Sequence, residues 1–316
     1  MNLQTKLPIS KEALNPITYN SKILLLGSCF SENIGNKLSY YKFHSYQNPF
    51  GILFHPKAIE NLIINALNEK EYTEDDVFFL NERWHCFESH SSLSSINKNK
   101  LLENLNHAVF NTKTQIKNAT HILITLGTSW VYRFIEKDEI VANCHKIKQK
   151  NFLKEILTVD EVVECLEATT ALIQSANKKA TIMFTVSPVR HLKDGFTQNQ
   201  QSKSHLISAI NQIVSPRNNT HYFPSYEIMM DELRDYRFYA DDMIHPNQTA
   251  INYIWKNFVE SWISEDSYDI MKEVAAIQSG LNHKPFNPNS TKHKDFLNTL
   301  ESKISKLKTL HPSIIF

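Results

Sequence analysis

Two side chains that can act as nucleophiles follow a short apolar run near the start of the chain. Residues 23–26 are Ile-Leu-Leu-Leu, and Gly27, Ser28 and Cys29 come directly after them. An apolar run that ends at glycine and leads into helix-capping residues predicts a buried strand that turns sharply into a helix. Open α/β sheets bind ligands at the carboxyl ends of their strands, so Ser28 and Cys29 are candidate nucleophiles. The alternative is that Cys29 only fills a small apolar space.

A carboxylate and an imidazole, Asp242 and His245, lie three residues apart near the end of a predicted α/β domain. Pro246 follows, and because proline does not fit the interior of a helix, the pair must lie in a loop before the apolar helix at 250–262. At this separation the carboxylate can accept the Nδ1 proton, and Nε2 can then face a nucleophile. A solvated loop or a helix cap has the same spacing. A position after the last strand of the sheet strengthens the catalytic interpretation.

The elements that must hold these residues alternate between strand and helix. Helical spacing of apolar residues, with proline or capping residues at several starts, predicts helices from residue 31 and at 56–67, 100–116, 158–173, 202–214 and 250–262. Short apolar or alternating runs predict strands at 23–26, 42–47, 121–126, 181–187 and 221–223, and a β excursion at 131–140. This order is typical of a three-layer α/β/α sandwich with a central, mostly parallel five-stranded sheet.

Residues 72–98 interrupt the alternation and have no clear period. Long aperiodic segments inside a compact domain are usually functional or disordered, and the aromatic residues here argue against disorder. We predict a loop or short hairpin inserted over the sheet end, with His85 and His90 either lining the site or simply packed. We assign residues 1–264 to the α/β domain and 265–316 to a C-terminal extension of two amphipathic helices. These helices pack on the domain or pair with another subunit.

Composition excludes several classes of function. The 34 basic and 33 acidic residues give no general attraction to nucleic acid or to anionic lipid. No apolar run approaches the roughly 18 residues of a membrane helix, and the start of the chain lacks the order of a signal peptide, so we predict a cytoplasmic protein. The cysteines lack C-x-x-C spacing, and Asn143, Cys144 and His145 lack partner ligands, so no metal site or disulfide is predicted. The glycines at strand ends are single, so we expect no nucleotide and no cofactor.

The motifs together resemble the GSCFA-domain family, which is similar to the SGNH/GDSL hydrolase superfamily. The resemblance covers residues 22–262 and rests on Gly-Ser-Cys-Phe, Asn-Pro-Phe-Gly, Leu-Gly-Thr-Ser-Trp-Val-Tyr, Ala-Asn-Cys-His-Lys, Val-Ser-Pro-Val-Arg-His-Leu-Lys-Asp-Gly and Asp-Met-Ile-His-Pro. It implies an SGNH-hydrolase-like fold with the strands in flavodoxin-like order. In this fold Cys29 would take the place of the nucleophilic serine and Ser28 that of an aspartate. It also implies Gly51 as an oxyanion-hole glycine. Ser129 stands where the superfamily has an asparagine donor, a role that Asn143 could fill instead.

An arrangement of Cys29, His245 and Asp242 would be competent in acyl transfer. A thiol gives up its proton more easily than a hydroxyl, and a helix amino terminus favours the thiolate further. We therefore predict a hydrolase of ester-linked acyl groups on a small polar or carbohydrate substrate, with Ser28 as the rival nucleophile. An acyltransferase with the same site is one alternative. A binding or assembly module on a degenerate hydrolase scaffold is another, because the aspartate and asparagine of the superfamily pattern are missing.

Other motif residues are candidates for binding the substrate or its oxyanion. Arg190 and His191 follow a predicted strand and could bind an anionic group of the substrate. A salt bridge from Arg190 to the acidic loop near Asp241 is the alternative. The remaining candidates come from the motifs already named and are Asn48, Gly127, Thr128, Trp130, His145 and His85.

Overall fold

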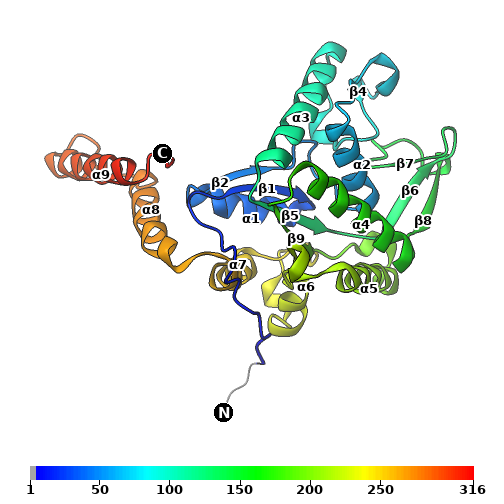
Figure 1. Cartoon of the computed structure of the whole chain (residues 1–316). Helices are drawn as coiled ribbons and strands as arrows, with labels where there is room; N and C mark the ends of the chain where they lie inside the picture. The colour runs from blue at the N-terminus through cyan, green and yellow to red at the C-terminus, as the bar shows by residue number, and fades with distance from the viewer. Residues whose placement is uncertain (1–4) are drawn as a thin grey trace.

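A central sheet of five parallel strands organises the computed structural model, which describes residues 5–316 (Figure 1). The spatial order of the strands is β10-β9-β5-β1-β2, and every pairing in this sheet is parallel. The predicted α/β class, the five strands and the flavodoxin-like order are confirmed. The strands are β1 (Lys22–Gly27), β2 (His44–Gln47), β5 (His121–Leu126), β9 (Thr181–Val186) and β10 (Thr220–Tyr222).

Helices cover both faces of this sheet (Figure 1). Leu24 and Leu26 of β1 belong to the core beneath α2 (Pro56–Leu67), α3 (Lys98–Asn118), α4 (Val159–Ala176) and α5 (Phe196–Ile213). Ile23 and Leu25 belong to the opposite core, beneath α1 (Cys29–Tyr40) and α7 (Gln248–Trp262). These four side chains are at most 1% exposed. Because successive strand residues point to opposite faces, one uninterrupted apolar run serves both cores.

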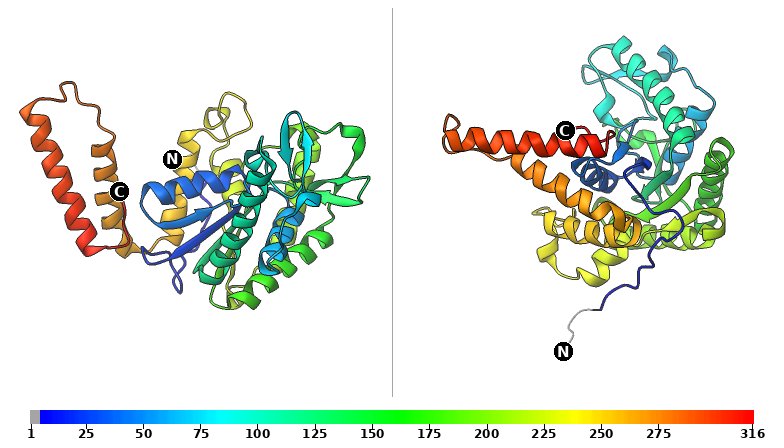
Figure 2. Two further views of the ribbon diagram at one scale, coloured as in Figure 1. Left: turned by 90° about the horizontal axis from the view of Figure 1, so that it is seen from above. Right: turned by 60° about the vertical axis from the view of Figure 1, so that its left-hand side comes forward.

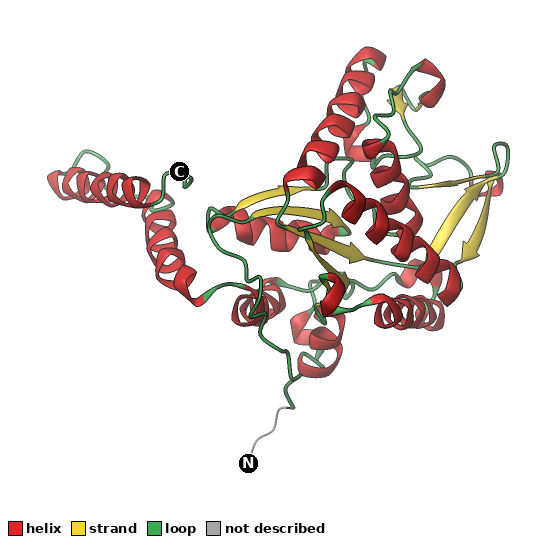
Figure 3. Ribbon diagram, viewed as in Figure 1, coloured by secondary structure: helices red, strands yellow, loops and turns green. Residues whose placement is uncertain are grey.

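Two smaller sheets stand apart from the central one (Figure 3). Within residues 72–98, β3 (Phe78–Leu80) and β4 (Arg83–His85) form an antiparallel hairpin between the short helical turns Glu74–Asp76 and Ser91–Leu93. After β5, the strands β6 (Trp130–Phe134), β7 (Glu139–Val141) and β8 (Phe152–Ile156) form an antiparallel sheet. The sequence does not predict β8, because its residues are mostly exposed or half-buried and carry no continuous apolar run.

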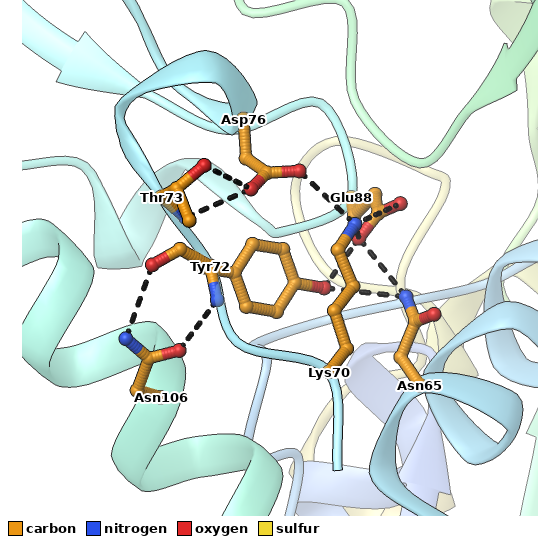
Figure 4. Close-up of polar contacts among 7 residues, drawn as sticks. All are labelled: Asn65, Lys70, Tyr72, Thr73, Asp76, Glu88 and Asn106. Atoms are coloured by element: carbon orange, nitrogen blue, oxygen red, sulfur yellow. Dashed lines mark hydrogen bonds and ion pairs between the residues drawn. The ribbon is translucent and has the colours of Figure 1, made fainter. Parts of the chain in front are cut away.

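A polar network ties residues 72–98 to two helices of the main domain (Figure 4). The Tyr72 hydroxyl donates to the Glu88 carboxylate, and Lys70 Nζ lies 3.1 Å from the same carboxylate. Asn65 of α2 donates to Glu88 at 3.0 Å. Asn106 of α3 exchanges two hydrogen bonds with the Tyr72 backbone, at 2.7 and 3.2 Å. This segment is therefore held by buried and half-buried polar contacts rather than left as a free loop.

The chain ends in a helical hairpin that projects from one side of the domain (Figure 2). Its helices are α8 (Tyr268–Leu281) and α9 (Thr291–Leu310). α8 buries Met271, Val274 and Ile277 in the same core as α1 and α7, whereas α9 buries only Leu300 and Leu307. Since α8 shares that core, the division at residue 264 stays a proposal. Within residues 5–316, no helix has both the length and the apolar character to cross a membrane.

Candidate functional site

The turn from β1 into α1 carries Ser28 and Cys29 at the carboxyl edge of the central sheet. Gly27 has a φ of +133°, and a Cβ atom there would lie 2.1 Å from the Thr125 carbonyl oxygen of β5, so this position requires glycine. Ser28 Oγ accepts a hydrogen bond from the Phe30 N–H at 3.2 Å and caps α1. Ser28 is buried, whereas Cys29 is partly exposed. The thiol is therefore the more accessible of the two candidate nucleophiles.

The surroundings of Cys29 keep its thiol protonated at neutral pH. Burial raises the pKa of Cys29, and the Glu32 carboxylate on the same helix adds to the rise. The Lys203 ammonium and the first backbone N–H groups of α1 act in the opposite direction on this pKa. The outcome differs from the sequence-based expectation of a favoured thiolate, because burial outweighs the helix amino terminus. Cys29 thus needs a base to become a nucleophile.

Asp242 and His245 form a hydrogen-bonded pair in the loop before α7. His245 Nδ1 donates to Asp242 Oδ2 at 2.6 Å, and Asp242 Oδ1 accepts the backbone N–H groups of Ile244 and His245 at 2.9 and 3.0 Å. These hydrogen bonds, with that of the His245 backbone the largest, lower the pKa of Asp242 to about 2. Because a carboxylate only accepts, Nδ1 carries the proton, and Nε2 of the neutral ring keeps its lone pair. The pair is an oriented imidazole that can accept a proton.

Backbone contacts hold this loop at the sheet edge. Met243 has a left-handed φ of 55°, and the Ala240 N–H donates to the His245 carbonyl at 2.8 Å. The Arg190 N–H, which follows β9, donates to the Ile244 carbonyl at 3.2 Å. The loop is therefore joined to the segment that leaves the carboxyl end of β9.

No hydrogen bond joins the Cys29 turn directly to the Asp242/His245 pair within residues 5–316. Lys203 acts electrostatically on Cys29, and Lys203 and His245 both help to keep His191 neutral by lowering its pKa, after burial as the main cause. Within residues 5–316, no hydrogen bond joins His245 Nε2 to Ser28 or to Cys29. Hydrogen bonds between a catalytic base and its nucleophile are often long without substrate and tighten when it binds. The absence of this hydrogen bond in the described residues therefore does not by itself exclude His245 as a base for Cys29.

The oxyanion donors implied by the resemblance are occupied. The Gly51 N–H donates to the Asn48 carbonyl at 2.8 Å and closes a turn. His90 covers this turn, since its N–H donates to the Phe50 carbonyl at 2.9 Å. The Ser129 N–H donates to Ser202 Oγ at 2.7 Å, and the Ser129 hydroxyl lies 3.2 Å from the same atom in the core. In this geometry neither Gly51 nor Ser129 offers an unoccupied donor to a substrate.

Two other donors lie at the turn that carries Cys29. The Cys29 N–H begins α1, where the first N–H groups lack intrahelical acceptors. Asn48 Oδ1 accepts the Gly27 N–H at 3.0 Å, and Asn48 Nδ2 is buried without a hydrogen-bond partner in the described chain. A buried amide without a partner is unfavourable, so Asn48 Nδ2 is available to an acceptor that reaches it.

The segment after β5 braces the sheet edge. The N–H groups of Gly127 and Thr128 both donate to the Phe54 carbonyl, at 2.6 and 3.2 Å. The Thr128 hydroxyl is buried against Ser202 at 2.8 Å. Trp130 donates its indole N–H to the Gln198 carbonyl at 3.2 Å. These contacts give Gly127, Thr128 and Trp130 structural partners rather than free groups.

Three further candidates lie together: His85 of the segment 72–98, and Asn143 and His145 from the chain after β7. Burial lowers the pKa of His145 to about 4, and His145 Nε2 donates to the Cys86 carbonyl at 2.7 Å. His85 Nε2 donates to the Leu80 carbonyl at 3.0 Å. The described residues form no group of three acidic, cysteine or histidine side chains able to hold a metal ion. These candidates line a polar cavity of about 430 Å³ with Asn81, Arg83, Ser91, Ser94 and Lys146.

Arg190 opens onto a different pocket, of about 230 Å³, next to the loop of Asp242 and His245. Its guanidinium lies 5.4 Å from the centre of the Phe196 ring. Among the residues that the structure describes, Arg190 forms no ion pair, so the salt bridge considered from the sequence is not formed. The pocket is lined by Arg190, Met229, Met230, Leu233, Arg234, Asp235, Tyr236 and Tyr239.

Lys203 is a residue at this edge that the motifs do not single out. It is fully buried, and its Nζ donates to the Gly127 and Ser187 carbonyls at 2.7 Å each. The sequence does contain a signal for it. Lys203 lies three residues before Leu206 and seven before Ile210, both buried residues of α5. A lysine on the apolar face of a predicted helix is unusual enough to mark a special role.

Comparison with known proteins gives two matches along the chain. The model of the GSCFA family matches residues 22–258, which contain β1, the Cys29 turn and the Asp242/His245 loop. The model described as GSCFA domain protein, C-terminal domain, matches residues 274–316. A search of curated proteins finds no match.

Proposed function

We propose, from the premise that this chain belongs to the GSCFA family, that it hydrolyses ester-linked acyl groups with Cys29 as the nucleophile. The 2.6 Å hydrogen bond from His245 to Asp242 carries the proposal. It fixes the tautomer in which Nε2 can accept the thiol proton, and the loop is joined to the edge of the sheet that also bears Cys29. Cys29 is preferred to Ser28 because Ser28 is buried and caps α1.

The reaction would proceed in two acyl-transfer steps. Cys29 Sγ attacks the ester carbonyl while its proton passes to His245 Nε2, and Asp242 stabilises the imidazolium that forms. The tetrahedral intermediate expels the alcohol, which takes the proton from His245, and a thioester remains on Cys29. Water, deprotonated by His245, then attacks the thioester; the C–S bond breaks, Cys29 Sγ takes the proton back from His245, and the acid product is released. Exclusion of water in favour of another acceptor would make the same site an acyltransferase.

The oxyanion would be held by the Cys29 N–H and by Asn48 Nδ2. Both lie at the turn, and Asn48 Nδ2 lacks another partner among the described residues. Removal of one such donor costs about 10²–10³-fold in kcat in comparable enzymes. A small polar or carbohydrate ester is the proposed substrate class.

The proposal is tested with purified protein on a panel of activated esters and acylated sugars. Cys29→Ala and His245→Ala should each abolish turnover, whereas Ser28→Ala should keep the reaction while weakening the cap of α1. Cys144→Ala is the matched control, because Cys144 is also a partly exposed free cysteine. Turnover that persists in Cys29→Ala and His245→Ala, or that disappears only in Ser28→Ala, would contradict the assignment.

A second candidate function is a binding or assembly module. It is favoured by the occupied Gly51 and Ser129 donors and by the lack, within residues 5–316, of a hydrogen bond from His245 Nε2 to a nucleophile. The ester panel separates the two candidates. A well-folded protein that turns over none of the esters, yet binds one of the sugars with an affinity that Cys29→Ala leaves unchanged, would support the binding module.

A further inference from the structure

Lys203 places an ammonium group in the core without an acidic partner. The side chain is 0% exposed, and its Nζ contacts two carbonyl oxygens at 2.7 Å each. The Tyr226 ring centre lies 5.5 Å away, and no carboxylate in the described chain forms an ion pair with Lys203. Burying an unpaired ion is strongly unfavourable. A buried lysine of this kind either loses its proton or needs an anion nearby.

The Cys29 thiol can supply this negative charge when it loses its proton. The Ser28 N–H donates to the Thr125 carbonyl at 3.0 Å, and Gly127, which holds the Lys203 ammonium, lies two residues further along the same strand end. The turn that carries Cys29 and the ammonium therefore occupy neighbouring strand ends. The two side chains interact electrostatically, and each favours the charged form of the other.

We propose that the Lys203 ammonium is the counter-ion of the anion that forms at Cys29. In the free protein this anion is the thiolate, and in the reaction it is the oxyanion of the tetrahedral intermediate. The second part rests on the proposed hydrolase function, whereas the first concerns Cys29 alone. Lys203 is a positioning residue, because it acts on Cys29 through space and is too buried to touch a substrate.

The other ionisable groups around Cys29 do not supply this charge. Glu32 on α1 raises the Cys29 pKa. His191, after β9, lies next to Gly127, and burial lowers its pKa to about 3, so it is neutral. His245 acts on the pKa of His191. Burial lowers the pKa of His90, and the Glu32 carboxylate acts to raise it. Tyr226 packs against Lys203 as a neutral phenol, since burial raises its pKa.

The alternative to the proposal is that burial keeps Lys203 as a neutral amine. Burial lowers the pKa of Lys203 to about 7, while Cys29 acts to raise it, so the amine and ammonium forms lie close in free energy near neutral pH. A neutral amine has two N–H donors, which the Gly127 and Ser187 carbonyls already satisfy. In that form Lys203 would only brace the two strand ends. The experiment must therefore measure how the charge state of Lys203 changes the ionisation of Cys29.

The test is the pH dependence of Cys29 alkylation by iodoacetamide, followed by mass spectrometry of the tryptic peptide of residues 23–37, whose only cysteine is Cys29. In Lys203→Met the midpoint, which is the pH at which the alkylation rate reaches half its maximum, should rise by about one unit or more. This shift is about a tenfold loss of thiolate at neutral pH. Glu32→Gln should shift the midpoint downward. Lys154→Met is the charge-matched control and should leave it unchanged, because Lys154 pairs with Asp194.

Loss of the two hydrogen bonds could unfold Lys203→Met, so Lys203→Gln, which keeps an amide donor without the charge, is measured alongside. A third readout needs no change at Lys203. In Glu32→Gln, the ratio of the alkylation rates by anionic iodoacetate and by neutral iodoacetamide should be higher at Cys29 than at Cys144.

Equal midpoints in the wild type and a folded Lys203 variant, or equal reagent ratios at the two cysteines, would overturn the proposal. Alkylation needs no turnover, so an inactive protein that shows these shifts would disprove only the hydrolase function. An active hydrolase that shows none of them would disprove only the role of Lys203.

Discussion

Replacing Asp242 by asparagine tests the orientation of His245. The asparagine Oδ1 can still accept the Ile244 and His245 N–H groups, now at 2.9 and 3.0 Å, so the loop should keep its shape. Its Nδ2 would replace the oxygen that lies 2.6 Å from His245 Nδ1, and two donors would then face each other. The ring avoids this conflict by moving its proton to Nε2. That tautomer has no lone pair for the Cys29 proton.

The magnitude follows from the exposure of the pair. In a buried triad the same change costs about 10⁴-fold in kcat. Here the His245 and Asp242 side chains are 49% and 46% exposed, so water can stabilise other orientations of the imidazole ring. The loss in kcat should therefore be smaller than in a buried triad. We expect a fall in kcat/KM of about 10²–10⁴-fold, with little change in the thermal unfolding midpoint because exposed ion pairs contribute little to stability.

The assay is hydrolysis of an activated ester by the wild type, Asp242→Asn and Asp242→Ala. Asp242→Asn should be at least as impaired as Asp242→Ala, because alanine lets the ring keep either tautomer. Asp242→Asn with kcat/KM within threefold of the wild type, beside an inactive Cys29→Ala, would refute the orienting role. The pKa of Asp242 lies below that of the unfolded chain, so its contribution is present above about pH 4 and is lost as pH falls towards 2. Loss of activity at a higher pH should therefore not come from Asp242.

Three further changes test the scaffold by urea unfolding. Glu88→Gln should lower the free energy of unfolding by about 1–2 kcal/mol, because a charged acceptor of Lys70, Tyr72 and Asn65 is lost. An unchanged free energy of unfolding would mean that this network does not hold residues 72–98. Gly27→Ala should cost about 2–3 kcal/mol through the 2.1 Å approach to Thr125, whereas a wild-type stability would contradict the required positive φ. Val274→Ala should lower the free energy of unfolding by about 2 kcal/mol, because this residue is 0% exposed. The control is Lys272→Ala, and equal losses in the two variants would show that α8 does not share the core.

The fold could be predicted because its main signals are local. The apolar run of β1 and the capping box of Thr158 and Glu161 each specify one element from neighbouring residues, and the structure contains both. The alternation of strands with helices predicts the parallel sheet, whereas the order of its strands is expected from the resemblance. Strand β8 escaped prediction because it depends on pairing with β6 rather than on an apolar pattern of its own.

The candidate site was less accessible to sequence reasoning, because it depends on which partner each polar group finds. The spacing of Asp242 and His245 predicts their hydrogen bond, and the structure contains it. Gly51 and Ser129 carry suitable groups in suitable motifs, yet Asn48 and Ser202 occupy those groups. The sequence places Lys203 on the apolar face of a predicted helix, but its two carbonyl partners come from distant strand ends and are known only from the structure.

The proposed reaction requires that Cys29 accepts an acyl group with His245 as its base. The most direct measurement is peptide mass spectrometry of protein quenched in acid during turnover of an activated ester. We predict an acyl adduct on Cys29 in the wild type, no adduct at this residue in Cys29→Ala, and a greatly slowed adduct in His245→Ala. An adduct on Ser28 instead, or an adduct on Cys29 that forms equally fast without His245, would contradict the account.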